Sequence, residues 1–431
     1  MLVGCFTVNL RPFLRNLMKQ LLLIPNVRKY FLAFQSSDFR WLWTGGLGGH
    51  SAYWGLIVVR GVLVLQVTNS PSMVGITTFA AMAPRFFTPP LAGYFSDRYT
   101  RRTVLLTGYI AQILHSVLLT MLGILGVLGP WSIVALAIFN GAVRSFQMTA
   151  TQSLIPNVVP KEHLLNAVSL NMISTHGSKF LGPGLMAIPL IFLNANWGFA
   201  ICGGLYLTGL VGIFRIKART TGGIKKGTSF GASQKEAIIY ILQSNSLRTL
   251  FILIMLHCSL TMAYESLLPI FAKMVLNNPT SGVSYLMMGV GIGSVVFALV
   301  VAGISSNQVR GRMLFILGIV SGISLIGLAF SNNFASAIFF TAMMGGSQVG
   351  FMAIANSMVQ TIAPDELRGR VTGLNQINIG GTMAILNLFN GIIAGNIGSD
   401  YVLITWGILF TLVMIISLPL NTPRLLYKGI T

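Results

Sequence analysis

One acidic side chain lies deep inside a long apolar stretch of this sequence. Glu265, within residues 264–269, is the only carboxylate well inside such a stretch. A carboxyl group held out of water binds a proton more readily than one in water, which suits reversible proton carriage or substrate binding. The alternatives are that Glu265 is a structural partner of Lys273 or of a base on another helix, or that it lies at a water-exposed membrane surface.

Basic residues inside apolar stretches outnumber this acid. Arg144 and Lys179 lie near the middle of their stretches, and Arg85 lies just below the middle of its own. Cations that converge on a cavity attract anionic or zwitterionic substrates. The alternative is that Arg144 and Lys179 brace the packing of helices. Arg60 and Lys273 lie nearer the outer ends, where we expect them to snorkel to the membrane surface.

Histidine and aromatic residues complete the candidate site. We take His50 and His257 as candidate proton relays, with packed, hydrogen-bonded histidines as the alternative. Trp54 is a candidate for lining a substrate cavity, and Tyr53 and Tyr264 are weaker candidates, with packing against lipid as the alternative for each. No metal-ligand cluster, nucleotide-binding loop or catalytic-triad spacing stands out, so we predict a protein that is not an enzyme and has no metal site or cofactor.

The composition requires a membrane protein around these groups. Of 431 residues, 54% are hydrophobic and only 8% are charged, whereas a soluble domain carries roughly a quarter charged residues. The net charge of +20 would suggest nucleic acid in a soluble protein. Here the basic residues cluster in alternate loops, so we expect a lipid bilayer and no nucleic acid as the partner.

Apolar runs near the ~20 residues that a spanning helix needs recur twelve times. We place the predicted spans at about residues 40–67, 71–96, 103–127, 131–155, 164–191, 196–215, 248–277, 281–304, 312–330, 335–362, 369–395 and 400–420. The predicted fold is therefore an all-α membrane protein with twelve transmembrane helices in two six-helix, pseudo-symmetric bundles. The predicted parts are a basic amphipathic N-terminal segment (1–38), the first bundle (39–215), a linker loop (216–247), the second bundle (248–420) and a tail (421–431).

The loops indicate the orientation. Lysine and arginine occur in every second loop, including 98–102, 217–235 and 310–312, whereas the intervening loops have none. The positive-inside rule then places both termini and the linker in the cytosol, and we expect a bacterial inner membrane.

We expect a short helix near residues 234–243. Residues 10–21 have the pattern of an amphipathic surface helix, with a disordered leader or a mis-assigned start codon as alternatives.

The loop after the second predicted span has a distinctive charge pattern. Gly93 is followed by Asp97, Arg98, Arg101 and Arg102, and an acid with several bases at a membrane edge can hold one side of a transporter shut. The second half contains a similar loop, in which Asn307 stands in place of the acid. Its matching residues are Gly303, Arg310 and Arg312.

These features resemble the major facilitator superfamily, whose signature loop reads G-x-x-x-D-R-x-x-R-R/K. The stretches 155–167 and 364–374 are similar to the exporter branch that includes macrolide-efflux proteins and the enterobactin exporter, and the resemblance covers about residues 38–420. Gly182 and Pro183 match the core of the antiporter motif, which bends the fifth helix along the cavity. Ala187 and Ile188 stand where that motif closes with two glycines.

The resemblance implies a monomeric secondary transporter in which two bundles rock around a central site. We expect proton-coupled efflux of a small amphipathic or anionic compound such as a drug, a siderophore or a metabolite. The alternatives are an uptake symporter for a metabolite, a lipid flippase, and a membrane receptor or scaffold that kept the fold without transporting.

Overall fold

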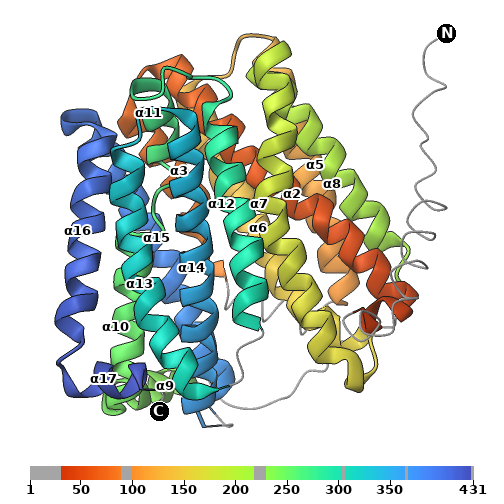
Figure 1. Ribbon diagram of the computed structural model, residues 1–431. Helices are drawn as coiled ribbons and strands as arrows, with labels where there is room; N and C mark the ends of the chain where they lie inside the picture. The colour runs from red at the N-terminus through yellow and green to blue at the C-terminus, as the bar shows by residue number, and fades with distance from the viewer. Residues whose placement is uncertain (1–30, 89–99, 218–229, 303–305, 365–366, 429–431) are drawn as a thin grey trace.

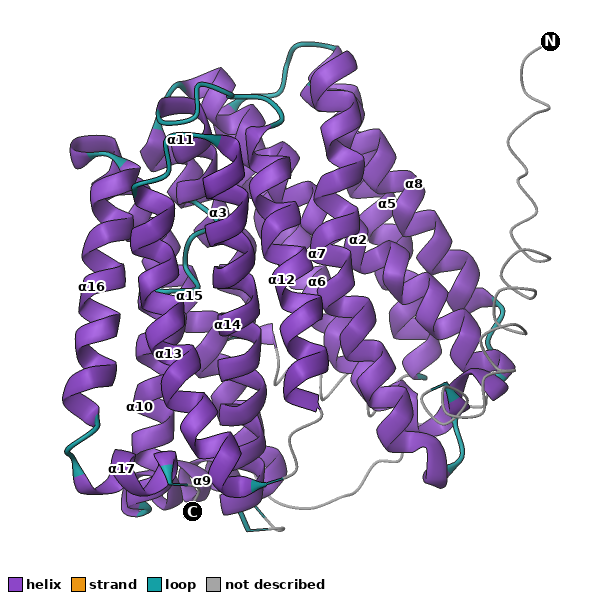
Figure 2. Ribbon diagram, viewed as in Figure 1, coloured by secondary structure: helices purple, strands orange, loops and turns teal. Residues whose placement is uncertain are grey.

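The computed structural model describes residues 31–88, 100–217, 230–302, 306–364 and 367–428. Every regular element within these ranges is a helix, as Figure 2 shows. Two short 3-10 turns, η2 (Leu32–Gln35) and η4 (Lys161–His163), accompany the long helices. The predicted amphipathic helix at residues 10–21 lies outside the described residues.

Most helices of the first half follow the predicted spans closely. The helices of this half are α2 (Ser37–Thr68), α3 (Pro71–Met82) with the 3-10 turn η3 (Ala83–Phe86), α5 (Arg101–Ile124), α6 (Pro130–Val158), α7 (Leu164–Phe192) and α8 (Ala195–Phe214). The predicted span 71–96, by contrast, begins as the short helix α3 and continues as a 3-10 turn. Polar caps fix several starts, because the hydroxyls of Ser36, Ser70 and Thr100 accept hydrogen bonds from backbone N–H groups in the first turn.

The second half contains one more break than we predicted. Its helices are α9 (Phe230–Gln243), α10 (Asn245–Leu260), α11 (Leu267–Met274), α12 (Gly282–Ala302), α13 (Asn307–Ala329), α14 (Phe334–Ile362), α15 (Arg368–Ile397), α16 (Ser399–Ser417) and α17 (Asn421–Tyr427). Helix α9 matches the short helix expected near residues 234–243. The predicted continuous span 248–277 is instead two helices, α10 and α11, separated at residues 261–266.

Fewer than twelve of the described helices have the length and apolarity of a membrane span. Within the described ranges nine helices are long and apolar enough to cross a membrane, or up to ten if α9 and α10, bent by 99°, count as one span. The other predicted spans coincide with α3 plus η3, with α7, and with α10 plus α11. Helix α7 is long enough, but its histidine, lysine and asparagine side chains lower its mean hydropathy, and the other two are broken into short pieces.

Most helices of the first half lie on one side of the molecule and most of the second half on the other, whereas α3 lies beside α15 of the second half (Figure 1). Within the first half, α2 packs against α7 and α8, and within the second half α14 packs against α12 and α13. The halves meet where α3 packs against α15 and where α7 packs against α12. At Gly75 a Cβ atom would lie 2.8 Å from the Leu388 carbonyl oxygen, so glycine permits the close approach of α3 to α15.

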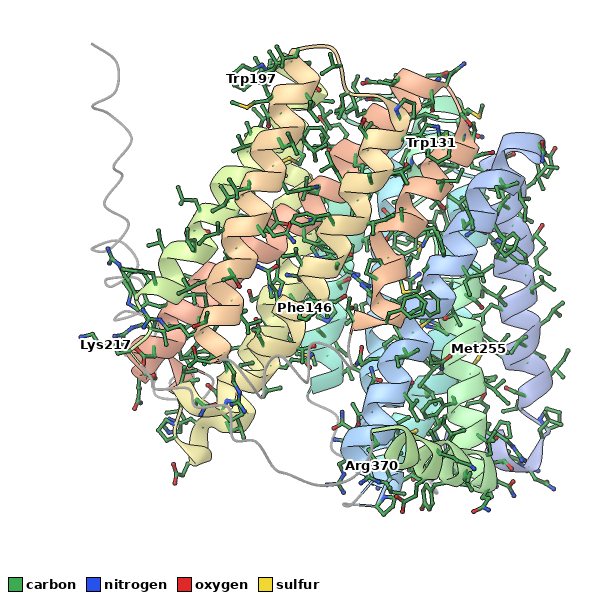
Figure 3. All side chains as sticks on the ribbon, turned by 180° about the vertical axis from the view of Figure 1, so that it is seen from behind. Trp131, Phe146, Trp197, Lys217, Met255 and Arg370 are labelled. Carbon is green, nitrogen blue, oxygen red and sulfur yellow. The ribbon has the colours of Figure 1, made fainter. Side chains whose placement is uncertain are left out.

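The two ends of the helices differ in chemistry. Trp131 and Trp197 lie at one end of the molecule, and Lys217 and Arg370 lie at the other (Figure 3). We call the end that carries α9, α17 and Lys217 the basic face, and the end that carries the α2–α3 loop the opposite face. The close approaches between halves run from Pro71 and Gly391 near the opposite face to Arg85 and Gly380.

Candidate functional site

Glu265 lies in the non-helical break between α10 and α11. Its side chain is buried, and its Oε2 atom has no hydrogen-bond partner among the described residues. Non-helical backbone at membrane depth is tolerated only where protein satisfies its polar groups or where it lines a cavity. A break of this kind is typical of ion and substrate sites in transporters.

Three side-chain amides from α14 and α15 satisfy this break. The Gln348 amide donates to the Thr261 carbonyl at 2.6 Å, and the Asn390 amide donates to the Ala263 carbonyl at 2.6 Å. Asn387 accepts a hydrogen bond of 2.9 Å from the backbone N–H of Ser266. The amides therefore replace the helical hydrogen bonds on both sides of Glu265 and fix its backbone.

Glu265 faces cations from three other elements. It interacts electrostatically with Arg85 of η3, Lys179 of α7 and Arg60 of α2. Arg60 and Lys179 are only 4% and 7% exposed, so lipid or solvent does not neutralise their charge. Buried charges need partners, and the described cations here outnumber the single carboxylate. The cluster can therefore bind an anionic group in addition to Glu265.

Two adjacent aromatic residues of α2 contact two of these cations and a third one, Arg144. The Arg85 Nη2 atom donates to the Tyr53 hydroxyl at 2.6 Å, and the Arg144 guanidinium lies 4.9 Å from the centre of the Tyr53 ring. The Lys179 ammonium lies 4.6 Å from the centre of the Trp54 ring. Trp54 thus lies within the candidate site as we expected, and Arg144, 7% exposed, joins it from α6.

The two candidate proton relays occupy different places. His50 is buried on α2 and interacts electrostatically with Arg144 and His176, which places it beside the cation cluster. His257 stacks on Phe351 with ring centres 4.1 Å apart and packs edge-on against Phe410 at 5.2 Å. The structure therefore does not bring His257 to the cluster, but buries it in the core of the second half.

Arg60 does not snorkel, contrary to our expectation. Helices α3, α7 and α8 pack around α2, so the Arg60 side chain is enclosed by protein and is only 4% exposed. Lys273 does lie near the opposite face, but its ammonium group donates to the Asn69 side chain. The bases that interact electrostatically with Glu265 are Arg85, Lys179 and Arg60, which lie on other elements.

The remaining predicted residues of the cavity and the helix bend lie nearby. Tyr264, 2% exposed, precedes Glu265 in the break. Pro183 lies inside the continuous helix α7. A Cβ atom at Gly182 would lie 2.3 Å from the Ser51 carbonyl oxygen, so Gly182 permits a close crossing of α7 over α2. This crossing brings Lys179 to Trp54.

The predicted gating loop is described only in part. Gly93, Asp97, Arg98 and Gly303 lie outside the described residues. Arg101 donates to the Asn157 side chain at the end of α6. Arg102 donates to the Phe214 carbonyl at 2.6 Å, which joins the start of α5 to the end of α8. The similar loop of the second half leads into α13, where Arg310 is partly buried and Arg312 is exposed.

Two features of the site were missed or given little weight. Tyr53 was a weak candidate, although the spacing of His50, Tyr53 and Arg60 places all three on one face of a helix. The amides Gln348, Asn387 and Asn390 were not candidates. Pro269 and the polar residues near position 265 were a signal for the break itself, because proline removes a helical hydrogen-bond donor.

Comparisons with known proteins agree on the kind of molecule. The profile of a family described as transmembrane secretion effectors matches residues 30–427. A multidrug efflux pump, Tap, from Mycolicibacterium fortuitum is 25% identical over 325 residues, which cover 72% of this chain and 78% of the relative. The staphyloferrin A transporter of Staphylococcus aureus is 22% identical over 308 residues, which cover 70% of this chain and 74% of the relative.

Solved structures give the same fold at low sequence identity. A mutant of the nucleoside transporter NupG superposes with a TM-score of 0.75 at 11% identity, and the match covers 88% of this chain and 99% of NupG. The human organic anion transporter MFSD10 superposes with a TM-score of 0.64 at 13% identity over 88% of this chain and 98% of MFSD10. At these identities the likeness concerns the fold alone.

Proposed function

Because the chain belongs to the transmembrane secretion effector family of the major facilitator superfamily, we propose that it exports a small amphipathic or anionic compound in exchange for protons. In this proposal it has twelve spans in two six-helix bundles, and the basic face lies in the cytosol. The names of the two relatives above, a multidrug efflux pump and a staphyloferrin A transporter, support export of this class of compound.

The observation that carries the proposal is the position of Glu265. It is a buried carboxylate in a helix break, opposite Arg60, Arg85 and Lys179 of the first half. A rocking motion of the two halves would separate the acid from these bases and change what each can bind. Glu265 thus couples proton binding to the conformational change, and the cations bind the anionic group of the substrate.

Exchange requires that the substrate and the proton exclude each other at Glu265. A zwitterionic substrate meets this requirement, because its cationic group binds the Glu265 carboxylate while its anionic group binds Arg85, Arg144 or Lys179. A compound with only negative groups would not displace the proton. Within the amphipathic and anionic class, the proposal therefore favours compounds that carry both an anionic group and a hydrogen-bond donor or cationic group.

A second candidate, proton-coupled uptake, is favoured by the excess of buried cations. When Glu265 is protonated it no longer competes for Arg85 and Lys179, so a purely anionic substrate binds together with the proton. Such a substrate would move in the same direction as the proton. The direction of proton movement relative to the substrate therefore distinguishes the two functions.

The test measures proton movement in proteoliposomes that contain a pH-sensitive dye. Siderophores, macrolides and organic anions are added to vesicles with wild type, Glu265→Gln, or Glu162→Gln, whose exposed carboxylate lies outside the spans. We expect substrate-triggered flux in wild type and in Glu162→Gln, and loss of flux in Glu265→Gln. Protons that move against the substrate support export, and protons that move with it support uptake. Equal flux in all three proteins would remove Glu265 from coupling.

A further inference from the structure

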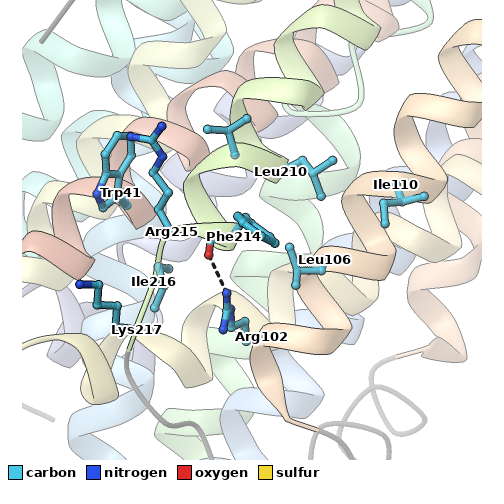
Figure 4. Close-up of a pocket in the computed structure, with 10 residues that line it drawn as sticks. Trp41, Arg102, Leu106, Ile110, Leu210, Phe214, Arg215, Ile216 and Lys217 are labelled. Carbon is cyan, nitrogen blue, oxygen red and sulfur yellow. Dashed lines mark hydrogen bonds between the residues drawn. The ribbon is translucent and has the colours of Figure 1, made fainter.

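A groove lies on the outer surface of the first half, between α5 and α8 at the basic face. Its volume is about 1170 Å³. Figure 4 shows its side chains, which come from the start of α2, from α5, and from the end of α8 with the residues that follow it. Its lining residues include Trp41, Arg102, Ile110, Val211, Phe214, Arg215 and Lys217.

The walls of the groove are apolar and face outward. Ile110 of α5 is 46% exposed and Phe214 of α8 is 69% exposed. Both α5 and α8 are long and apolar enough to cross a membrane, so this surface faces the hydrocarbon of the bilayer. The walls can therefore contact an acyl chain that lies along the two helices.

The end of the groove at the basic face is cationic. Arg102 donates to the Phe214 carbonyl at 2.6 Å, which neutralises the negative end of α8. The Arg215 guanidinium lies 4.6 Å from the centre of the Trp41 ring, and both Arg215 and Lys217 are exposed. Among the described residues one acid lies nearby, because Asp38 accepts a hydrogen bond of 3.3 Å from the backbone N–H of Lys217. The three bases exceed this one acid.

We propose that this groove binds an anionic phospholipid, with the phosphate at Arg215 and Lys217 and one acyl chain along α5 and α8. Charge complementarity selects this occupant, since cations at the membrane boundary attract anionic headgroups. A tryptophan beside the cations is also typical of the membrane interface. The segment 1–30 of this chain is a poorer occupant, because it carries Arg11, Arg15, Lys19, Arg28 and Lys29 and would bring like charge.

The experiment places the full chain in nanodiscs that contain phosphatidylglycerol with brominated acyl chains, because bromine quenches the fluorescence of nearby tryptophans. The quenching is measured for wild type and for Trp41→Phe. The difference between the two is the quenching of Trp41 and reports how fully the lipid occupies the groove. We expect stronger quenching by brominated phosphatidylglycerol than by brominated phosphatidylcholine. The double variant Arg215→Gln/Lys217→Gln should weaken binding about 30-fold, since each base near an anionic surface contributes roughly fivefold. The matched control Arg424→Gln/Lys428→Gln removes one exposed base of α17 and the exposed base that follows it, and should leave the quenching unchanged.

A second pair of variants tests the acyl-chain part without changing charge. Val211→Trp places a bulky side chain in the groove and should reduce occupancy by the brominated lipid, measured by native mass spectrometry of the retained lipid. Ile408→Trp makes the same change on the exposed face of α16 and should not. Equal quenching by the two lipids, or unchanged lipid binding in both groove variants, would overturn the proposal. So would binding that begins only after residues 1–30 are deleted, because the groove would then belong to that segment.

Discussion

At the scale of single residues, Tyr53 positions two of the substrate-binding candidates. Its hydroxyl accepts from Arg85 at 2.6 Å, and its ring lies 4.9 Å from the Arg144 guanidinium. One aromatic side chain thus holds two like charges close together in a site shielded from water. We infer that Tyr53 sets the spacing of the two guanidinium groups, and hence the shape of the anion that they bind.

Substitutions at Tyr53 separate these two interactions. Tyr53→Phe keeps the ring beneath Arg144 but removes the acceptor of Arg85. A hydrogen bond to a charged group contributes about 1.5–3 kcal/mol, so the half-maximal substrate concentration for proton flux should rise at least about tenfold. Tyr53→Leu removes the ring as well and should raise it further. The control Tyr285→Phe, on α12, should match wild type, and wild-type values for both Tyr53 variants would contradict the inferred role.

At the scale of elements, the break between α10 and α11 depends on its neighbours. Three buried backbone groups of this break, the carbonyls of Thr261 and Ala263 and the N–H of Ser266, bond to side-chain amides of α14 and α15. Without them the buried backbone would lose stability, because a buried unsatisfied polar group costs about 1–3 kcal/mol. The position of Glu265 is therefore a property of three elements rather than of its own segment.

Asn387→Leu tests this dependence. It removes the acceptor of the Ser266 N–H group and keeps the number and branching of the heavy atoms in the side chain. We expect the melting temperature of the purified protein to fall by a few degrees, consistent with a loss of about 1–3 kcal/mol. Thr382→Val is the control on the same helix, because among the described residues the Thr382 hydroxyl bonds to two carbonyls of its own α15, those of Asn378 and Ile379. An Asn387→Leu variant as stable as Thr382→Val would argue against the proposed support.

At the scale of the whole molecule, the two halves approach each other near the opposite face. The contacts of α3 with α15 and of α7 with α12 extend from that face to the level of Arg85. In Figure 1 the two groups of helices lie close together at the top and diverge towards the bottom, where α9 and α17 lie. We infer that this conformation is closed at the opposite face, and that transport requires the contacts of α3 with α15 to separate.

A disulfide between α3 and α15 should arrest that separation. A Cβ atom at Gly395 would lie 3.6 Å from the Ser72 hydroxyl oxygen, which is within reach of a disulfide. We expect Ser72→Cys/Gly395→Cys to cross-link under oxidation, to lose substrate-triggered proton flux, and to regain it on reduction. Cys5, Cys202 and Cys258 are replaced by alanine in the background, and each single cysteine variant is a control. Full flux in the oxidised double variant would show that the contact does not need to open.

The sequence by itself determined the class of the protein and the limits of most helices. Apolar length alone decides where a chain can cross a bilayer, because every backbone polar group must be satisfied within the span. Helices α2, α5, α6 and α8 accordingly begin and end within a few residues of the predicted spans. The rarity of charge in such spans likewise singled out Glu265, Arg144 and Lys179.

Only the tertiary structure decided which of these charges meet. Depth along a helix can be counted from the sequence, but the direction of a side chain depends on which helices pack around it. Arg60 is buried because α2 is enclosed by its neighbours, and His257 is remote because α10 packs it against Phe351. The break at Glu265 likewise required amides that lie 87 and 127 residues further along the chain than the carbonyls they bind. Long-range packing, which no local pattern encodes, assembled the candidate site.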